Sequence, residues 1–333
     1  MKLKSLFSPK NLPTIVTLGL FILMFGLGSV SFRGFFSLQN FLNLFIDNAY
    51  LIIIAVGMTF VIISGGIDLS VGSMLALSTM VTSSLLEKSR WDPLYVIPVV
   101  LLMGVALGLF MGWLIQTFTI PPFIITLAGL YLARGLCYVV SIDTIGITHP
   151  FWQTMASSAI PIAGNSFISP SVIIAVLILI AGMYVSRFTK FGRTVFAIGG
   201  NEQSAVLMGL PVARTKILLY AFSGFCSALA GIVFTFYTLS GYALNGRGME
   251  MDAIATVVIG GTLLSGGVGS VLGTLFGVFV YGTIQVLIVF QGTLNSWWTR
   301  IAIGFLVFVF CLLQRLFEVR KGGKRRKSSA AKV

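Results

Sequence analysis

Residues 49–86 have the sequence AYLIIIAVGMTFVIISGGIDLSVGSMLALSTMVTSSLL, and Asp68 is the only charged side chain among them. A helix of about 20 apolar residues is long enough to cross the hydrocarbon core of a bilayer, which is roughly 30 Å thick. This run is nearly twice as long, so one helix cannot account for it. Ser64-Gly65-Gly66 interrupts it near the middle, which predicts two membrane-embedded helices joined at a glycine break.

The composition of the whole chain indicates the same lipid environment. Hydrophobic residues make up 57% and charged residues 9% of the 333 positions, and the mean hydropathy is +1.01. So little polar surface cannot cover a soluble globule of this size. The alternating ten-residue segments of a membrane β-barrel do not occur in the sequence. We therefore predict an all-α integral membrane protein.

Apolar runs between charged or turn-rich segments predict about ten transmembrane helices, two of them interrupted by glycine. The expected spans are 12–31, 40–63, 68–86, 94–116, 123–142, 170–187, 213–237, 252–265, 270–290 and 297–315. A single transmembrane domain would then cover residues 1–315, with a basic tail over 316–333. An even number of crossings returns both termini to one side and leaves Gln153 and Asn245 on the other.

The net charge of +13 is concentrated in three segments: the N-terminus, the loop at about 188–212 and the tail. Lys and Arg are enriched in cytoplasmic segments of membrane proteins, so both termini and this loop are expected in the cytoplasm. Four consecutive bases, Lys324 to Lys327, are typical of a segment that contacts lipid headgroups. We expect a bacterial cytoplasmic (inner) membrane protein that binds no nucleic acid.

A second long apolar run, residues 253–290, is also interrupted at glycines. It contains Ser265-Gly266-Gly267, and a Gly-x-Thr triplet precedes the glycines in both runs, at Gly57 and Gly260. The recurrence favours an internal duplication of two five-span halves, although a glycine-rich membrane chain can produce it by chance. Glycine-interrupted segments at matching places in two halves are typical of a transporter's substrate path.

The predicted substrate path follows from these two breaks. Its residues are Asn48, Ser64, Gly65, Gly66, Asp68, Asp252, Gly266 and Gly267. Asp68 has two possible roles. It can cap the next helix by accepting from the amide of Ser70 or Val71, or it can offer acceptors to a passing solute together with Ser64, Asn48 and Asp252.

The sequence contains no group of residues that would make the chain an enzyme. The phosphate-binding pattern Gly-x-x-x-x-Gly-Lys-Ser/Thr is absent, so ATP is expected to be hydrolysed elsewhere. No cluster of His, Cys, Asp or Glu has metal-binding or nucleophile spacing. Cys137, Cys226 and Cys311 stand singly in apolar runs and are expected to be packing residues, and His149 is expected to be solvated or to cap a helix.

The cytoplasmic loop contains a short element suited to contact a partner. Asn201 can cap a helix over 202–208, with Glu202 in the first turn and Gly209 at its end. The alternative is an idle amphipathic linker on the membrane surface. No other compact element is expected in the cytoplasmic loops.

Several motifs resemble the permeases of ribose-, xylose- and galactose-type ABC importers over nearly the whole chain. They are Ser64-Gly-Gly-Ile-Asp-Leu-Ser-Val-Gly72, Thr189-Lys-Phe-Gly-Arg193, Ala197-Ile-Gly-Gly-Asn-Glu202 and Gly260-Gly-Thr-Leu-Leu-Ser-Gly-Gly267. Three further stretches look closest to one of the two permease subunits of a galactofuranose importer. These are Phe123-Ile-Ile-Thr-Leu-Ala-Gly129, Tyr237-Thr-Leu-Ser-Gly-Tyr-Ala243 and Gly292-Thr-Leu-Asn-Ser-Trp-Trp298.

The resemblance implies a permease dimer with a second, homologous chain, cytoplasmic ABC ATPases that bind ATP and magnesium, and a periplasmic sugar-binding protein. This chain would itself hold no cofactor. Its coupling element would contact the ATPase through Gly200, Asn201, Glu202, Ser204, Ala205 and Gly209. In the family's loop the small residues form an Ala-Ala pair, whereas Ser204-Ala205 stands here.

The expected function is therefore import of a monosaccharide, galactofuranose by the resemblance, driven by ATP hydrolysis on partner subunits. Few charges and many hydroxyl and backbone groups along the path suit a neutral, hydroxyl-rich solute. Two alternatives remain: a permease for an amino acid or nucleoside, and an ion-coupled secondary carrier. A carrier would work as an isolated chain, whereas an ABC permease requires its ATPase.

Overall fold

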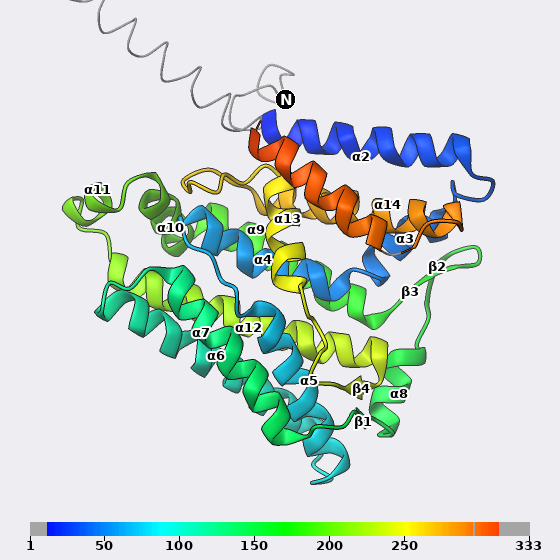
Figure 1. Ribbon diagram of the computed structural model, residues 1–333, viewed down its shortest axis with the longest axis horizontal. Coiled ribbons are helices and arrows are strands. Elements are labelled where there is room, and N and C mark those ends of the chain that lie inside the picture. The colour runs from blue at the N-terminus through cyan, green and yellow to red at the C-terminus, as the bar shows by residue number, and fades with distance from the viewer. Residues whose placement is uncertain (1–11, 296, 313–333) are drawn as a thin grey trace, which may run out of the picture.

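The chain folds almost entirely into helices, as its composition predicts (Figure 1). The computed structural model describes residues 12–295 and 297–312, so the predicted basic tail over 316–333 lies outside the described residues. The helices are α2 (Leu12–Ser31), α3 (Leu38–Ile46), α4 (Ala49–Ile63), α5 (Val71–Glu87), α6 (Pro93–Thr117), α7 (Pro122–Val140), α8 (Pro150–Ser157), α9 (Pro170–Phe188), α10 (Lys190–Gly200), α11 (Glu202–Leu207), α12 (Val212–Thr238), α13 (Met249–Ile259) and α14 (Val271–Gln291). A last helix, Trp297–Leu312, carries no label and is drawn in orange to red.

Six of the described helices are long and apolar enough to cross a membrane. The count rises to seven if α3 and α4, which meet at an angle of 57°, form one span. Two shorter apolar helices, α5 and Trp297–Leu312, add to these. Each of the ten predicted spans contains a helix, and the protein is a multi-pass helical membrane protein.

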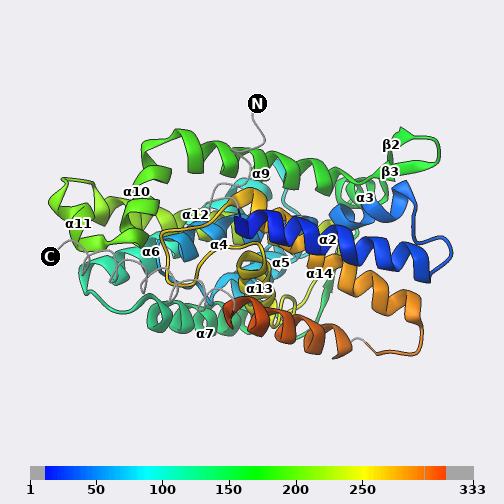
Figure 2. The ribbon, with the colours of Figure 1, turned by 90° about the horizontal axis from the view of Figure 1, so that it is seen from above.

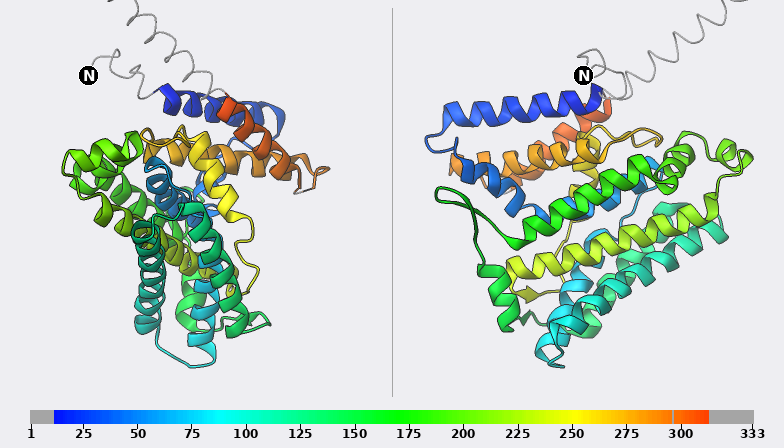
Figure 3. Two further views of the ribbon diagram at one scale, coloured as in Figure 1. Left: turned by 60° about the vertical axis from the view of Figure 1, so that its left-hand side comes forward. Right: turned by 180° about the vertical axis from the view of Figure 1, so that it is seen from behind.

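The predicted span at 252–265 is wrong. Its helix, α13, has 11 residues and ends at Ile259, and a helix of that length reaches only about 16 Å. In Figure 1 α13 stands upright, across the horizontal direction of α2, α12 and α14, and Figure 3 shows the same crossing from two other sides. The apolar composition of 252–265 therefore reflects burial inside the protein, because α13 packs against α4 and α14.

Helix α4 forms the centre of the core. All of its residues except Tyr50 are buried, because the helix has no polar face and is surrounded by α9, α12, α13 and α14. Helix α12 also packs closely on α6, where a methyl group at Gly108 would overlap the carbonyl of Tyr220. Small residues at such contacts allow helix backbones to approach within a membrane.

The two ends of the molecule differ in structure. Helices α10 and α11 lie together at one end, and the β2–β3 hairpin (Ile160–Ala163 and Ser166–Ile168) lies toward the other (Figure 2). Helix α8 lies toward the same end as the hairpin (Figure 1). Strands β1 (Ile145–Gly146) and β4 (Ser240–Gly241) pair antiparallel. His149 Nδ1 accepts a hydrogen bond from the amide of Phe151 and caps α8, which confirms capping as its role.

Candidate translocation and coupling site

The first predicted glycine break is present at the end of α4. Gly65 has a φ of +85°, and its amide donates to the carbonyl of Ile62 at 2.9 Å. The amide of Gly66 donates to the carbonyl of Val61 at 3.0 Å. A glycine in the left-handed conformation with such a pair of hydrogen bonds is a common helix terminus. The next helix, α5, begins only at Val71.

The second break has the same geometry but at a different sequence position. Gly261 has a φ of +91° and donates to Val258 at 2.9 Å, and Thr262 donates to Val257 at 3.2 Å. Gly260-Gly261-Thr262 is therefore the structural counterpart of Ser64-Gly65-Gly66. The register that aligned the latter with Ser265-Gly266-Gly267 is wrong.

Ser265-Gly266-Gly267 has another function in the fold, because it meets the first break directly. The amide of Gly267 donates to the carbonyl of Ile63 at 2.8 Å. A methyl group at Gly266 would lie 2.9 Å from the nitrogen of Gly65. Gly266 and Gly267 both have positive φ, at +84° and +75°, so a side chain at either would also strain the backbone.

A third segment closes against the same atoms. Gly199, near the end of α10, packs so tightly that a methyl group there would overlap the carbonyl of Ile63 and approach the amide of Gly267. We call the five residues that meet here the glycine junction: Ile63, Gly65, Gly199, Gly266 and Gly267. The junction connects the first break, and the segment that follows the second break, to the loop predicted at 188–212 to be cytoplasmic.

Asp68 is 1% exposed, and both of its carboxylate oxygens accept hydrogen bonds. Oδ1 accepts from the amide of Ser70 at 2.9 Å and from its hydroxyl at 2.6 Å. Oδ2 accepts from the hydroxyl of Ser223 on α12 at 2.6 Å. Asp68 thus makes the predicted capping contact before α5 and also joins this turn to α12.

Asn48 and Asp252, the other polar residues of the predicted path, lie apart from the junction. Asn48 is 1% exposed at the bend between α3 and α4; its Nδ2 donates to Leu44, and its Oδ1 is buried without a hydrogen-bond partner. Asp252 on α13 interacts with Tyr281 and with the charge of Arg300. Both contact α14, since Asn48 packs on Gly282. The predicted path residues therefore form two groups.

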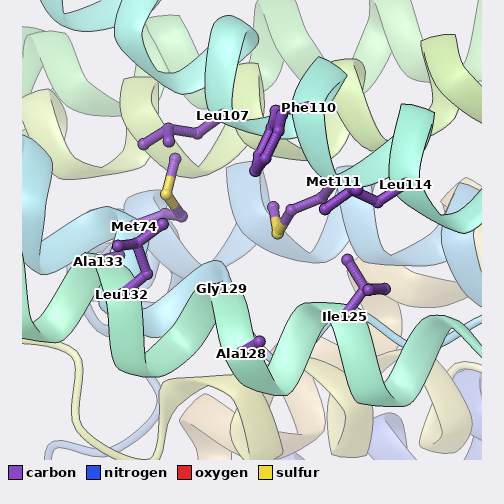
Figure 4. Close-up of a pocket in the computed structure, with 10 residues that line it drawn as sticks. All are labelled: Met74, Leu107, Phe110, Met111, Leu114, Ile125, Ala128, Gly129, Leu132 and Ala133. Atoms are coloured by element: carbon purple, nitrogen blue, oxygen red, sulfur yellow. The ribbon is translucent and has the colours of Figure 1, made fainter.

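Two cavities near these elements differ in chemistry. One of about 130 Å³ is lined by the first break, from Ser64 to Gly66, and by Tyr220, Lys216 and Glu202 among others. The other, of about 170 Å³, lies between α5, α6 and α7 and is lined entirely by apolar side chains and Gly129 (Figure 4). Of these two cavities, the first offers hydrogen-bonding groups to a polar solute. A third cavity, of about 390 Å³, is lined by Tyr50, Tyr237 and four serines among others, and offers such groups as well.

Helix α11 has the predicted ends. The side chain of Asn201 accepts from the amide of Ser204 at 2.7 Å, and Glu202 forms an ion pair with Lys216 of α12 at 2.5 Å. Gly209 has a φ of +74°, and its amide donates to Val206. The expectation that this is the only compact cytoplasmic element is wrong, because α10 precedes it with Thr189 as its N-cap.

The orientation of α11 buries one of the predicted coupling residues and leaves others exposed. Ala205 is completely buried and packs with Ile198 and Val212. Gly200, Glu202 and Ser204 are exposed. The most prominent surface, which sequence reasoning missed, is formed by Val206, Leu207 and Met208, exposed by 56%, 87% and 67%. Three successive apolar residues beside the turn were the available clue.

Comparison of the sequence with known proteins assigns the chain to a family. The sequence profile described as "Branched-chain amino acid transport system / permease component" matches residues 40–311. The chain belongs to this permease family. It is 51% identical to the inner membrane ABC transporter permease protein YjfF of Escherichia coli, over 92% of each chain. It is 40% identical to the fructose import permease protein FruG of Bifidobacterium longum, over 94% of each chain.

A third relative is the ribose import permease protein RbsC of Haemophilus influenzae, 36% identical over 90% of this chain and 92% of that protein. No solved structure matches the chain. As an ABC permease component, the protein is a multi-pass subunit of the inner membrane, without an ATPase domain, and ATP binds to a partner ATPase. Membership also implies a solute-binding protein as a partner.

Proposed function

We propose that this permease carries a neutral monosaccharide into the cytoplasm in an ABC importer. The observation that supports this most is the glycine junction, in which Gly199, next to the proposed coupling element, packs on the carbonyl of Ile63, which also accepts from Gly267. A movement of α10 that follows ATP binding on a partner would therefore reach the first break and the segment that follows the second. The breaks expose backbone amides and carbonyls, which must face protein or water.

The choice of a sugar rests on the relatives and on the chemistry of the breaks. Two relatives are named as fructose and ribose import permeases. The cavity at the first break offers the hydroxyl of Ser64 and the ring of Tyr220, groups that suit a hydroxyl-rich neutral solute. The resemblance of 123–129, 237–243 and 292–298 to a galactofuranose importer makes galactofuranose the proposed sugar.

The proposed contact with the ATPase is the exposed surface of α11. Val206, Leu207 and Met208 project from a capped helix whose inner side is anchored by Ala205. Removing a side chain such as Leu207 from water is worth about 1.5–3 kcal/mol, so a complementary groove on the ATPase would bind this surface tightly. The remaining proposed partners are a homologous second permease chain and a periplasmic sugar-binding protein.

Reconstitution of the complete complex in proteoliposomes tests this function. Radiolabelled galactofuranose, galactopyranose and ribose are each supplied with the binding protein outside and ATP inside the vesicles. We expect ATP-dependent uptake of galactofuranose, and no uptake when the ATPase carries a hydrolysis-deficient substitution. Uptake of another sugar alone would replace the proposed substrate but keep the class.

The family description favours a second candidate, because it names branched-chain amino acid transport. Leucine, isoleucine and valine are therefore included in the same assay. Amino acid uptake without sugar uptake would overturn the sugar proposal. Uptake by the permease alone, driven by an ion gradient, would contradict the ABC mechanism itself.

A further inference from the structure

We infer that residues 242–252 form the surface that the second permease chain covers, so that the two chains meet across this segment and the start of α13. This inference rests on the proposed function, because it assigns a place to the partner chain named there. Three observations support it: the position of the segment along α5 in the membrane domain, its non-helical backbone, and its exposed charged side chains.

The depth of this surface follows from its neighbours. Asn245 Nδ2 donates to Thr79 Oγ1 in the middle of α5. Gly246 and Glu250 pack on Gly72, in the first turn of the same helix. The segment therefore runs along α5 within the membrane domain. Asn245 is half-buried against this helix, and the external side predicted for it stays a prediction.

The backbone of residues 242–248 is not helical, and Arg134 supplies hydrogen-bond donors to two of its carbonyls. Its Nη1 donates to the carbonyls of Ala243 and Asn245, at 2.5 and 2.9 Å. Arg134 belongs to α7, a candidate membrane span. Irregular backbone at membrane depth is tolerated only where protein or a water-filled cavity covers it. Lipid is therefore excluded as the neighbour of this segment.

The side chains of this surface lead to the same conclusion. Arg247 is exposed, Met251 is 58% exposed, and Glu250 and Asp252 are partly exposed. A charged side chain facing the centre of a bilayer costs about 2.5–3.5 kcal/mol or more. Helix α9 is different, because its large exposed side chains, such as Leu177 at 61%, are apolar or aromatic over most of its length. Helix α9 has the composition of a lipid-facing helix.

A second chain of the same fold is the occupant that this charge pattern fits. Glu250 and Asp252 are partly exposed carboxylates, while Arg247 nearby is an exposed cation. When two equivalent surfaces meet about a two-fold axis, each residue of one chain faces a different residue of the other. Cations and carboxylates of the two chains can then pair. Figure 2 shows α7, α13 and the helix Trp297–Leu312 toward the same side of the molecule.

Photocrosslinking in the intact membrane complex tests the inference. p-Benzoylphenylalanine is incorporated at position 251, at position 244 on the same surface, and at position 177 on α9 as the control. Leu177 and Met251 are matched, since they are exposed by 61% and 58%. We expect an adduct with a permease chain, identified by mass spectrometry, from 251 or 244 and none from 177.

ATP-dependent uptake by each substituted complex separates this inference from the proposed function. Uptake without a permease adduct at 251 and 244 would mean that lipid or another subunit covers the surface, which overturns the inference and leaves the function intact. A permease adduct from 177 but not from 251 or 244 would place the second chain on α9 and also overturns it. If the unsubstituted complex itself showed no ATP-dependent uptake, that result would contradict the proposed function instead.

Discussion

The amide of Gly267 donates a hydrogen bond to the carbonyl of Ile63, at 2.8 Å, and thereby joins the first break to a segment about 200 residues later in the sequence, which follows the second break. Gly199 of α10 packs against the same carbonyl. Three segments therefore share one backbone oxygen. Displacement of α10 cannot leave this contact unchanged unless Ile63 and Gly267 move with it.

Substitution of Gly199 by alanine tests the junction. The new methyl group would overlap the carbonyl of Ile63, and overpacking of this kind costs about 1–3 kcal/mol. We expect Gly199→Ala to lower both ATP-dependent uptake and the thermal stability of the purified complex. The measurements are initial uptake rates in proteoliposomes and melting temperatures in detergent.

The adjacent glycine provides a matched control. A methyl group at Gly200 would meet no atom within 4 Å, so Gly200→Ala is expected to behave as wild type. Equal uptake and stability in the two variants would show that the close approach at Gly199 has no consequence for transport.

The exposed surface of α11 leads to a second prediction. Leu207→Ser removes the most exposed apolar side chain of this helix and should weaken ATPase docking by roughly ten- to a hundredfold, since burial of leucine is worth about 1.5–3 kcal/mol. Uptake should fall while the permease remains in the membrane. Co-purification of the ATPase measures docking directly.

Gln203→Ser is the control on the same short helix, because Gln203 is exposed and polar. Glu202→Ala and Gly209→Pro are expected to uncouple hydrolysis from uptake. The first removes the ion pair with Lys216, and the second forces a positive φ of +74° into proline's negative range. Wild-type uptake by Leu207→Ser and Gly209→Pro would exclude α11 as the coupling element.

The sequence was sufficient for the fold class because hydropathy reports directly on the lipid environment. It misassigned α13 because burial in protein and burial in lipid favour the same apolar residues. The end of α13 depends on the positive φ of Gly261 and on a hydrogen bond from Thr262 to Val257. The sequence does not reveal whether the helix ends at Gly260-Gly261-Thr262 or at the later Ser265-Gly266-Gly267, because both triplets contain two glycines.

Only those features of the candidate site that depend on local contacts were predictable from the sequence. The caps at Asn201 and Asp68 are local contacts within two or three residues, so residue types and spacing reveal them. The importance of Gly199 over Gly200 and the burial of Ala205 depend on packing against distant segments. Orientation of a six-residue helix is set by that packing rather than by its own pattern.

A third prediction concerns topology. A cysteine at Gln203, on α11, should react with a membrane-impermeant maleimide only after the cells are permeabilised, because basic segments remain in the cytoplasm. A cysteine at Gln153, exposed on α8, should react in intact spheroplasts. A cysteine at Asn245 should also react only from outside, but slowly, since this residue is half-buried against α5. Reaction of position 203 from outside would reverse the assignment of the coupling surface.

Substitutions of Asp68 form the fourth prediction, because they separate a cap from a residue that contacts solute. Asp68→Ala leaves three donor groups, two on Ser70 and one on Ser223, without their acceptor. Each unsatisfied buried group costs about 1–3 kcal/mol, so this variant should be depleted from the membrane. Ser223→Ala removes only one donor and should be less destabilising.

Asp68→Asn is the informative variant of this series. Its carbonyl oxygen can still accept from Ser70, and its amide can donate to the hydroxyl of Ser223, so the cap and the link to α12 are both retained. Because Asp68 is only 1% exposed, we expect a normal membrane level and normal uptake. Immunoblots of membranes and initial uptake rates measure the two quantities. A normal membrane level with strongly reduced uptake would instead show that the carboxylate contacts the solute when the breaks open, and would return Asp68 to the substrate path.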